Sequence, residues 1–561
     1  MTISIEQLIS QERTLLKIDQ TEVLAGLALS GGGVRAAMVA LGVIDTLKTE
    51  DLLKHFTYVS AVSGGGYAAA YMLEESAEHK GPIRSFKAPS YHGPTAIIAF
   101  LFESFVRFMW LSIVALIFLL LTQILFSYTS RNLWPLSGTA LKVSAGIFAA
   151  TIFTRSIMAM YLAQLPHKRV AMRRYRHVPR LILSGIFVFW LYRWFEFIIA
   201  TDLPTDTNWL ARYATIGSTA FFLLILTLVF NRRFEMTFVD EPLFSYYRNQ
   251  LREIFAEKNN ELSSYADGRK PYPIFNATAN NNIHIEPFEL TPMACGTASI
   301  HYIETSRLLT PMKLADAMAI SGSAIDLVNH EWSWLDFLSI FSGGTGRWFP
   351  HFEVQSKWSA YARICWKMLS NIPSDRILRL YDGGFTDNLG MIALLRRKAN
   401  FIVCVDAAYD PEFRFADLRA TCRFAESEQL AIIDASPLQQ LMHDLRFIGD
   451  KNRFVKLAAA YPDQDKTATI IYIKLAARSG QQIPSRKSFP EFPQITTNDQ
   501  KLTPTQMEDL YDLGKNLAAE CIGAVKSGLQ KSCQNHTEAL HVAESYPESA
   551  IKPTSDGCAS S

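Results

Sequence analysis

The stretch FTYVSAVSGGGYAAAYML, residues 56–73, decides which fold the sequence predicts. β-Branched and aromatic residues predominate at positions 56–62, three glycines follow Ser63, and an alanine-rich segment begins at Tyr67. This order predicts a strand, a sharp turn and a helix. Ser63 stands on the turn, where it is either a nucleophile or a serine that caps the helix.

The residues on either side repeat the alternation of strand and helix. Residues 23–30 (VLAGLALS) predict a strand that ends at glycines, and residues 36–53 have helical spacing. Residues 377–410 predict a strand, a glycine turn, a helix and a second strand. Strands that alternate with helices favour βαβ units, so we expect an α/β fold with a mostly parallel sheet.

Composition narrows the class of protein. The 561-residue chain has 55 basic and 53 acidic residues, so its net charge of +2 indicates no nucleic-acid partner. Seven scattered cysteines contain no CxxC pair, and the twelve histidines show no metal spacing, so we expect no disulfide framework and no metal. Only 19% of residues are charged, 12% are aromatic and the mean hydropathy is +0.08, which suggests that part of the chain lies in lipid.

Four apolar segments are candidate membrane spans. Residues 108–126 and 213–230 contain no charge and have the length needed to cross a bilayer. Two weaker candidates, 140–165 and 181–200, are interrupted by charges. The connection at 167–180 holds six Lys or Arg residues, so the positive-inside rule places it and both soluble flanks in the cytoplasm. We expect four spans; two remain the alternative if the weaker pair are buried or interfacial helices.

Three glycine-rich turns each follow an apolar strand: LALSGGGVRAA (27–37), AVSGGG (61–66) and LYDGGFTDN (380–388). The first lacks the lysine and hydroxyl of a Walker A loop and does not match GxGxxG, so we do not expect nucleotide binding. Together the turns supply what ester cleavage by a serine needs. Ser63 is the candidate nucleophile, and Asp382 is the candidate base. Consecutive glycine peptides can donate to an oxyanion: Gly31, Gly32 and Gly33.

In this order, SGGGVRAA, AVSGG and DGGFTDNLG resemble the patatin-like phospholipase family, which is similar to the catalytic domain of cytosolic phospholipase A2. The resemblance implies a three-layer α/β/α domain, a Ser63–Asp382 dyad without histidine, and hydrolysis of phospholipid, lysophospholipid or other glycerolipid esters without a cofactor. It assigns the oxyanion hole to the glycines 31–33, and it makes Arg35 a support for that loop or a phosphate contact. Ala61 departs from the family's GxSxG pattern, and Ser30 stands where many relatives have aspartate.

These features predict four parts of the chain: an N-terminal part of the catalytic domain at 1–98, a transmembrane insertion at 99–232, a C-terminal part of the catalytic domain at 233–533 and a disordered tail at 534–561. The dyad flanks the insertion, so its two members can meet only if the number of crossings is even. We expect a multi-pass membrane protein whose catalytic domain faces the cytoplasm and takes membrane lipids as substrate.

Several alternatives stay open. A lipid transacylase would use the same dyad with a different acyl acceptor, and a catalytically silent membrane scaffold would keep only the fold. A Ser–His–Asp triad is a further alternative. Other polar residues near the motifs are expected to be structural, Asp387 and Asn388 at a helix cap and Asp406 and Asp410 at a strand end.

Overall fold

The computed structural model describes residues 2–18, 23–74, 240, 244–280, 285–324, 346–350, 356, 359–360, 363–364, 377–448, 453–462, 467–478, 481–496 and 502–544. The predicted transmembrane insertion at 99–232 lies outside these ranges, so its spans are not part of the description. Within the described ranges, no helix combines the length and the apolar character needed to cross a bilayer.

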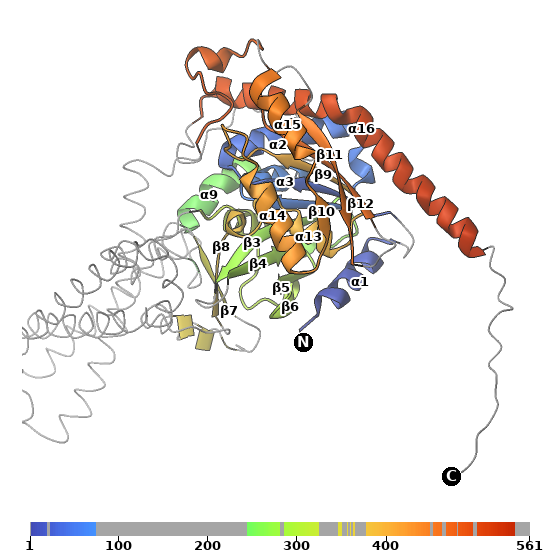
Figure 1. The fold of residues 1–561 in the computed structure, drawn as a ribbon. Helices are drawn as coiled ribbons and strands as arrows, with labels where there is room; N and C mark the ends of the chain where they lie inside the picture. The colour runs from blue at the N-terminus through green and yellow to red at the C-terminus, as the bar shows by residue number, and fades with distance from the viewer. Residues whose placement is uncertain are drawn as a thin grey trace, which may run out of the picture.

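A twelve-stranded sheet forms the centre of the domain (Figure 1). The strands are β1 (Ala25–Leu29), β2 (Tyr58–Val62), β3 (Tyr272–Asn280), β4 (Ile285–Leu290), β5 (Ala294–Thr297), β6 (His301–Glu304), β7 (Arg347–Pro350), β8 (Ile377–Asp382), β9 (Phe401–Asp406), β10 (Ile432–Asp434), β11 (Phe454–Ala460) and β12 (Thr467–Lys474). Their order is β10-β11-β12-β9-β1-β2-β3-β4-β5-β6, with β8 also paired to β3 and β7 paired to β8.

Only the centre of this sheet is parallel. The strands β12, β9, β1, β2 and β3 run in one direction. The remaining pairings are antiparallel. The prediction of a mostly parallel sheet is therefore wrong for the described strands, which form a mixed sheet. The prediction rested on residues 23–73 and 377–410, where helices lie between strands, as connections between parallel strands require. By contrast, β4, β5 and β6 follow one another through short turns, which produce antiparallel neighbours.

Helices cover both faces of the sheet. They are α1 (Ile5–Leu15), α2 (Gly33–Thr49), α3 (Gly64–Glu74), α9 (Phe244–Phe255), α10 (Leu314–Ser321), α13 (Ile392–Arg396), α14 (Ala416–Ser427), α15 (Leu438–His443) and α16 (Pro504–Glu544). Leu27 and Leu29 of β1 enter the core formed with α2, α3, α9, α10 and α16. Ala28 between them enters the opposite core, with α13, α14 and α15. The period of two along the strand thus produces the predicted three layers.

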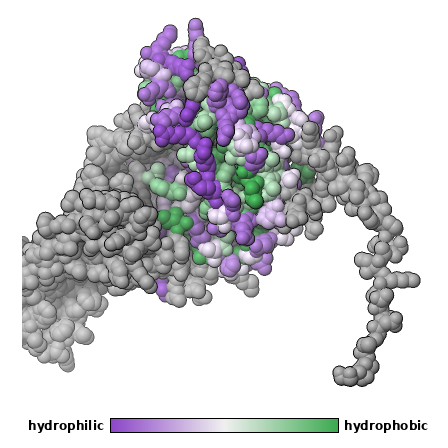
Figure 2. Space-filling model, viewed as in Figure 1, coloured by the Kyte–Doolittle hydropathy of each residue, from purple (hydrophilic) through white to green (hydrophobic). Residues whose placement is uncertain are grey.

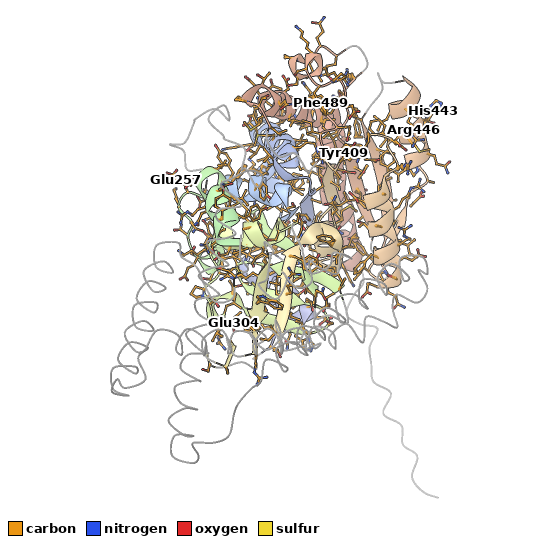
Figure 3. All side chains as sticks on the ribbon, turned by 90° about the vertical axis from the view of Figure 1, so that its left-hand side faces the viewer. Glu257, Glu304, Tyr409, His443, Arg446 and Phe489 are labelled. Atoms are coloured by element: carbon orange, nitrogen blue, oxygen red, sulfur yellow. The ribbon has the colours of Figure 1, made fainter. Side chains whose placement is uncertain are left out.

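The pictures agree with this layering. Glu257, which follows α9, lies on the opposite side of the domain from His443 and Arg446, which lie at and beyond the end of α15 (Figure 3). On the visible face, hydrophilic side chains are mixed with hydrophobic ones (Figure 2). One large apolar side chain with high exposure is Phe385, which is 60% exposed and follows Asp382 by three residues.

The long helix α16 packs against α2 at a close crossing of two glycines. A Cβ atom on Gly42 would lie 2.1 Å from the carbonyl oxygen of Tyr511, and one on Gly514 would lie 2.2 Å from that of Val39. The helix then continues to Glu544, into the segment predicted as a disordered tail from residue 534. Apolar periodicity is not needed to extend a helix that has already formed, and Ala, Leu and Glu are strong helix formers.

Candidate active site

Ser63 lies on a sharp turn between β2 and α3, and its φ angle is 48°. This left-handed conformation is uncommon for a residue other than glycine, and strained residues of this kind cluster at functional sites. The next two residues must be glycine: a Cβ atom on Gly64 would lie 1.9 Å from the carbonyl oxygen of Gly33, and one on Gly65 would lie 2.4 Å from that of Leu29. Strand, strained serine and helix together have the geometry of a nucleophile elbow.

Ala61 belongs to the strand that leads into the elbow, not to the turn itself. It is fully buried, and in the sheet it pairs with Leu29 on one side and Phe275 on the other. Its methyl group therefore packs in the core, and the turn at Ser63 forms with alanine at this position.

The strand β3 places Ser63 beside Asp382. β2 runs parallel to the first half of β3 and ends with Val62 opposite Asn276. β8 runs antiparallel to the second half and ends with Asp382 opposite Ala277. Because β4 occupies the other edge of β3, the ends of β2 and β8 approach each other along the same edge. The two candidate catalytic residues, far apart in the chain, meet there.

The side chain of Ser63 interacts with the carboxyl group of Asp382 and lowers its pKa. The Oδ1 atom of Asp382 accepts a hydrogen bond from the backbone N–H of Gly384, at 2.7 Å. Ser63 and Asp382 are only 6% and 7% exposed, and burial raises the pKa of Asp382 to about 6 although the contacts with Gly384 and Ser63 lower it. This carboxyl group ionises close to neutral pH, which suits a general base. Neither side chain has a histidine partner in the part of the chain that the structure describes.

The glycine loop lies beside the elbow, at the N-terminus of α2. The N–H of Gly31 donates to the carbonyl oxygen of Asn388 at 2.9 Å, so it is occupied. Gly32 and Gly33 have φ angles of 141° and 60°, which glycine adopts without strain. Their N–H groups have no acceptor among the described residues, and they lie at the positive end of the α2 dipole. Of the three predicted oxyanion donors, Gly32 and Gly33 are the two whose amides are available.

Arg35 is buried beneath this loop. Its Nε donates to the carbonyl oxygen of Ala407 at 2.9 Å, and its Nη1 donates to that of Ile495. Burial lowers the pKa of Arg35 to about 10, so the side chain is still charged at neutral pH. Of the two roles considered for Arg35, these contacts fit support of the loop.

Ser30 and Asp406 stabilise the same region from the neighbouring strand ends. Ser30 Oγ accepts from the N–H of Ala407 at 2.8 Å. Asp406 accepts from Lys474 Nζ at 2.8 Å and from the hydroxyl of Tyr472. These buried contacts are consistent with the predicted structural role of Asp406.

Asp387 and Asn388 also make structural contacts. Asp387 accepts from the N–H of Ile392 at 2.7 Å, at the start of α13, and from Thr421 Oγ1 at 3.2 Å. Asn388 donates to Asp417 Oδ2 at 2.6 Å. A Cβ atom on Gly31 would lie only 2.2 Å from the Oδ1 atom of Asn388. The position of Asn388 therefore requires glycine at residue 31.

The sequence analysis missed one part of the site, at the end of α10. Ser321, the last residue of α10, accepts from the backbone N–H of Ser63 at 2.9 Å. Two residues later, the carbonyl oxygen of Ser323 accepts from the N–H of Asp382 at 3.1 Å. The available signal was the run of small residues at 321–324, which permits the close approach, but it does not identify a partner. The described residues contain no cluster of His, Cys, Asp and Glu that could hold a metal.

Comparison with known proteins adds a family match over part of the chain. The model of the patatin-like phospholipase family matches residues 27–94, which include the glycine loop and the elbow. This match, over a small part of the chain, marks a similarity to that family. A comparison with curated protein sequences finds no match.

Three solved structures illustrate the structural similarity. Human GIVD cytosolic phospholipase A2 is 14% identical, with a TM-score of 0.47 over 95% of this chain. Its complex with methyl gamma-linolenyl fluorophosphonate is 14% identical, with a TM-score of 0.45 over 95% of this chain and 63% of that chain. VipD from Legionella pneumophila is 12% identical, with a TM-score of 0.21 over 93% of this chain and 76% of that chain. This chain spans 64% of the length of the first of these.

Proposed function

We propose that this protein is a lipid acyl hydrolase that cleaves carboxylic esters of phospholipids, lysophospholipids or other glycerolipids through a Ser63–Asp382 dyad. The observation that carries the proposal is that these two buried side chains meet and interact at a left-handed serine turn. The free amides of Gly32 and Gly33 beside the turn support it. The exposed ring of Phe385, on the turn after the base, offers apolar surface for an acyl chain.

The proposed reaction has two steps. Asp382 accepts the hydroxyl proton of Ser63 while the serine oxygen attacks the acyl carbonyl, and the resulting oxyanion accepts from the amides of Gly32 and Gly33. Collapse of this intermediate breaks the ester bond, and Asp382 returns the proton to the departing alcohol. Water, deprotonated by Asp382, then attacks the acyl-serine in the same way, releasing the fatty acid and regenerating Ser63.

We also propose that residues 99–232 anchor the protein as a multi-pass membrane insertion, with the catalytic domain on the cytoplasmic side. Described residues at both borders support an even number of crossings. Glu74, at the end of α3, accepts from the backbone N–H groups of Lys258 and Asn259 at 2.9 and 2.8 Å. Asp240 lies 3.8 Å from Arg248 of α9. Both borders therefore contact the same part of the domain, around α9, and an anchored site would draw its lipid from the adjacent leaflet.

Labelling with a fluorophosphonate probe tests the proposal. The full chain is reconstituted in lipid vesicles and compared with Ser63→Ala, and a known esterase serves as the positive control. We expect wild type to be labelled and the variant to stay unlabelled. An unlabelled wild-type protein beside a reactive esterase would refute the hydrolase and leave the scaffold.

A panel of lipid esters then identifies the reaction. Free fatty acid, produced by wild type and absent with Ser63→Ala, indicates hydrolysis. A new ester formed at the same residue would instead indicate the transacylase.

A further inference from the structure

We propose that Ser321 is a positioning residue that holds the nucleophile through its backbone, and that Tyr247 holds Ser321 in place. This inference deepens the proposed function and rests on it. The relevant contacts join α10, α9 and the elbow, three segments far apart in the chain.

Ser321 joins the elbow to β3. Its hydroxyl accepts from the N–H of Ser63 at 2.9 Å and donates to the carbonyl oxygen of Asn276 at 2.6 Å. Ser321 is fully buried, so water does not compete for these bonds. Ser63 has a φ angle of 48°, and a strained backbone of this kind persists only when its surroundings hold it. The hydroxyl of Ser321 provides one such restraint at the nucleophile itself.

The same segment also holds the base. The carbonyl oxygen of Ser323 accepts from the N–H of Asp382 at 3.1 Å. The end of α10 therefore contacts the main chain of both members of the dyad, and a shift of residues 321–323 would change the separation of the serine hydroxyl from the carboxyl group.

Tyr247 of α9 fixes this segment from the other side. Its hydroxyl donates to the carbonyl oxygen of Gly322 at 2.6 Å and is hydrogen-bonded to the hydroxyl of Tyr67. A Cβ atom on Gly322 would lie 2.4 Å from the hydroxyl oxygen of Tyr67 and 2.5 Å from that of Tyr247, so the two rings leave no free space there. Tyr67 lies one turn beyond the nucleophile, and its N–H donates to the carbonyl oxygen of Ser63 at 3.2 Å.

A buried ion cluster holds α9 against α10. Arg248, next to Tyr247, lies 3.1 Å from Asp316 of α10 and 3.8 Å from Asp240. Arg347 completes the cluster, at 3.2 Å from Asp316 and 3.1 Å from Asp240. All four side chains are nearly inaccessible to water, so screening is weak and the geometry is closely restrained. Tyr247 is thus presented to Gly322 by a rigid pair of helices.

Kinetics of Ser321→Ala test the inference. The variant leaves the N–H of Ser63 without its acceptor, and we expect labelling by the fluorophosphonate and kcat to fall by about 10- to 100-fold, with KM unchanged. Because the side chain of Ser63 lowers the pKa of Asp382, moving Ser63 away should also shift the midpoint of the pH–rate profile to higher pH. Ser321→Thr keeps the hydroxyl and should restore most of the rate. Tyr247→Phe should lower the rate by a smaller factor, about 3- to 10-fold, and shift the midpoint in the same direction.

Two matched controls separate positioning from stability. Ser485→Ala removes a buried serine hydroxyl that is hydrogen-bonded to Asp509, and Tyr461→Phe removes a buried tyrosine hydroxyl that donates to the carbonyl oxygen of Ala399 at 2.7 Å. Both should lower the melting temperature without changing the labelling rate or its pH midpoint.

The outcomes distinguish the two proposals. If wild type is not labelled, the proposed function fails and this inference fails with it. If wild type is labelled but Ser321→Ala has the same rate and pH midpoint, only the inference is overturned, and the same conclusion follows if Ser321→Thr restores nothing. Should Ser321→Ala not fold, Tyr247→Phe decides, and unchanged kinetics in that variant overturn the inference.

Discussion

The parallel centre and the antiparallel flank of the sheet each contribute one half of the candidate site, but by different means. Ser63 follows β2 in the parallel centre, and its turn depends mainly on residues close to it in the chain, such as Gly64 and Gly65. Asp382 ends β8 in the flank, and its position depends on the pairing of β8 with β3. The turn at Ser63 is thus specified by nearby glycines and restrained by the distant Ser321. The base is positioned entirely by tertiary pairing along β3, which belongs to both regions.

Removing either member of the dyad should have the largest effect. Ser63→Ala deletes the contribution of the parallel centre and Asp382→Asn that of the flank, and each should reduce hydrolysis of a lipid ester by about 10⁴-fold or more. The double variant should be no slower than the slower single variant, because the two groups act as a unit. Steady-state rates in vesicles measure this effect. A single variant that retained a tenth of the wild-type rate would show that the residue it replaces is not catalytic.

Next in size is the contact between the elbow and the glycine loop. Gly64→Ala places a methyl group 1.9 Å from the carbonyl oxygen of Gly33, so we expect a loss of about 2–4 kcal/mol in the free energy of unfolding and at least 100-fold in rate. Gly66→Ala is the matched control: the nearest atom is in Phe275 at 3.5 Å, an ordinary contact, so stability should change by less than about 1 kcal/mol. Urea denaturation measures both. Equal stability of the two variants would show that the elbow tolerates a side chain at 64.

The third prediction concerns the cost of the buried base. Asp382 has a pKa of about 6 in the folded protein and 3.8 ordinarily, so the folded state binds the proton more tightly than the unfolded chain does. Its contribution to stability is therefore complete below pH 3.8 and is lost as the pH rises through 6, a difference on the order of 3 kcal/mol. Asp382→Asn carries no such charge. Although inactive, it should be more stable than wild type at pH 8 by up to that amount.

Melting curves of both proteins between pH 4 and 8 test this prediction. The advantage of the Asn variant should shrink as the pH falls. An advantage that is independent of pH would mean that Asp382 does not ionise within this interval.

The activity of wild type should increase as Asp382 ionises, whereas its stability decreases. The base works when ionised, so kcat/KM should rise with pH and level off above a midpoint near 6, falling to about a tenth at pH 5. Initial rates with a soluble ester, across buffers matched in ionic strength, provide the profile. A flat profile from pH 5 to 8 would contradict the assignment of Asp382 as the base.

The smallest effect is expected at the departure from the family pattern. Ala61 packs in the core of the parallel centre, so Ala61→Gly should lower stability by about 1 kcal/mol and leave the rate within about threefold of wild type. A large gain in rate would show that the methyl group does distort the elbow.

Local sequence was a good guide wherever a structure depends on nearby residues. The strand–turn–helix at 56–73 and the glycine loop were predictable because a serine flanked by obligatory small residues leaves the chain few conformations. The helices and strands of 23–74 and 377–406 were recognisable from their periodicity for the same reason. The direction of the flanking strands was not, since it depends on the connections and partners of each strand and not on its own residues.

The sequence by itself determined the candidate nucleophile and base, the glycine loop and the alternation of strands and helices around them. Only the tertiary structure decided that the N–H of Gly31 donates to Asn388 and that Ser321 contacts Ser63. It also decided that Arg35 is held by the carbonyl oxygens of Ala407 and Ile495. The physical reason is that every backbone carries the same donor and acceptor groups, so residue type does not reveal their partners. Those partners appear only when distant segments meet, as β2 and β8 do on one edge of β3.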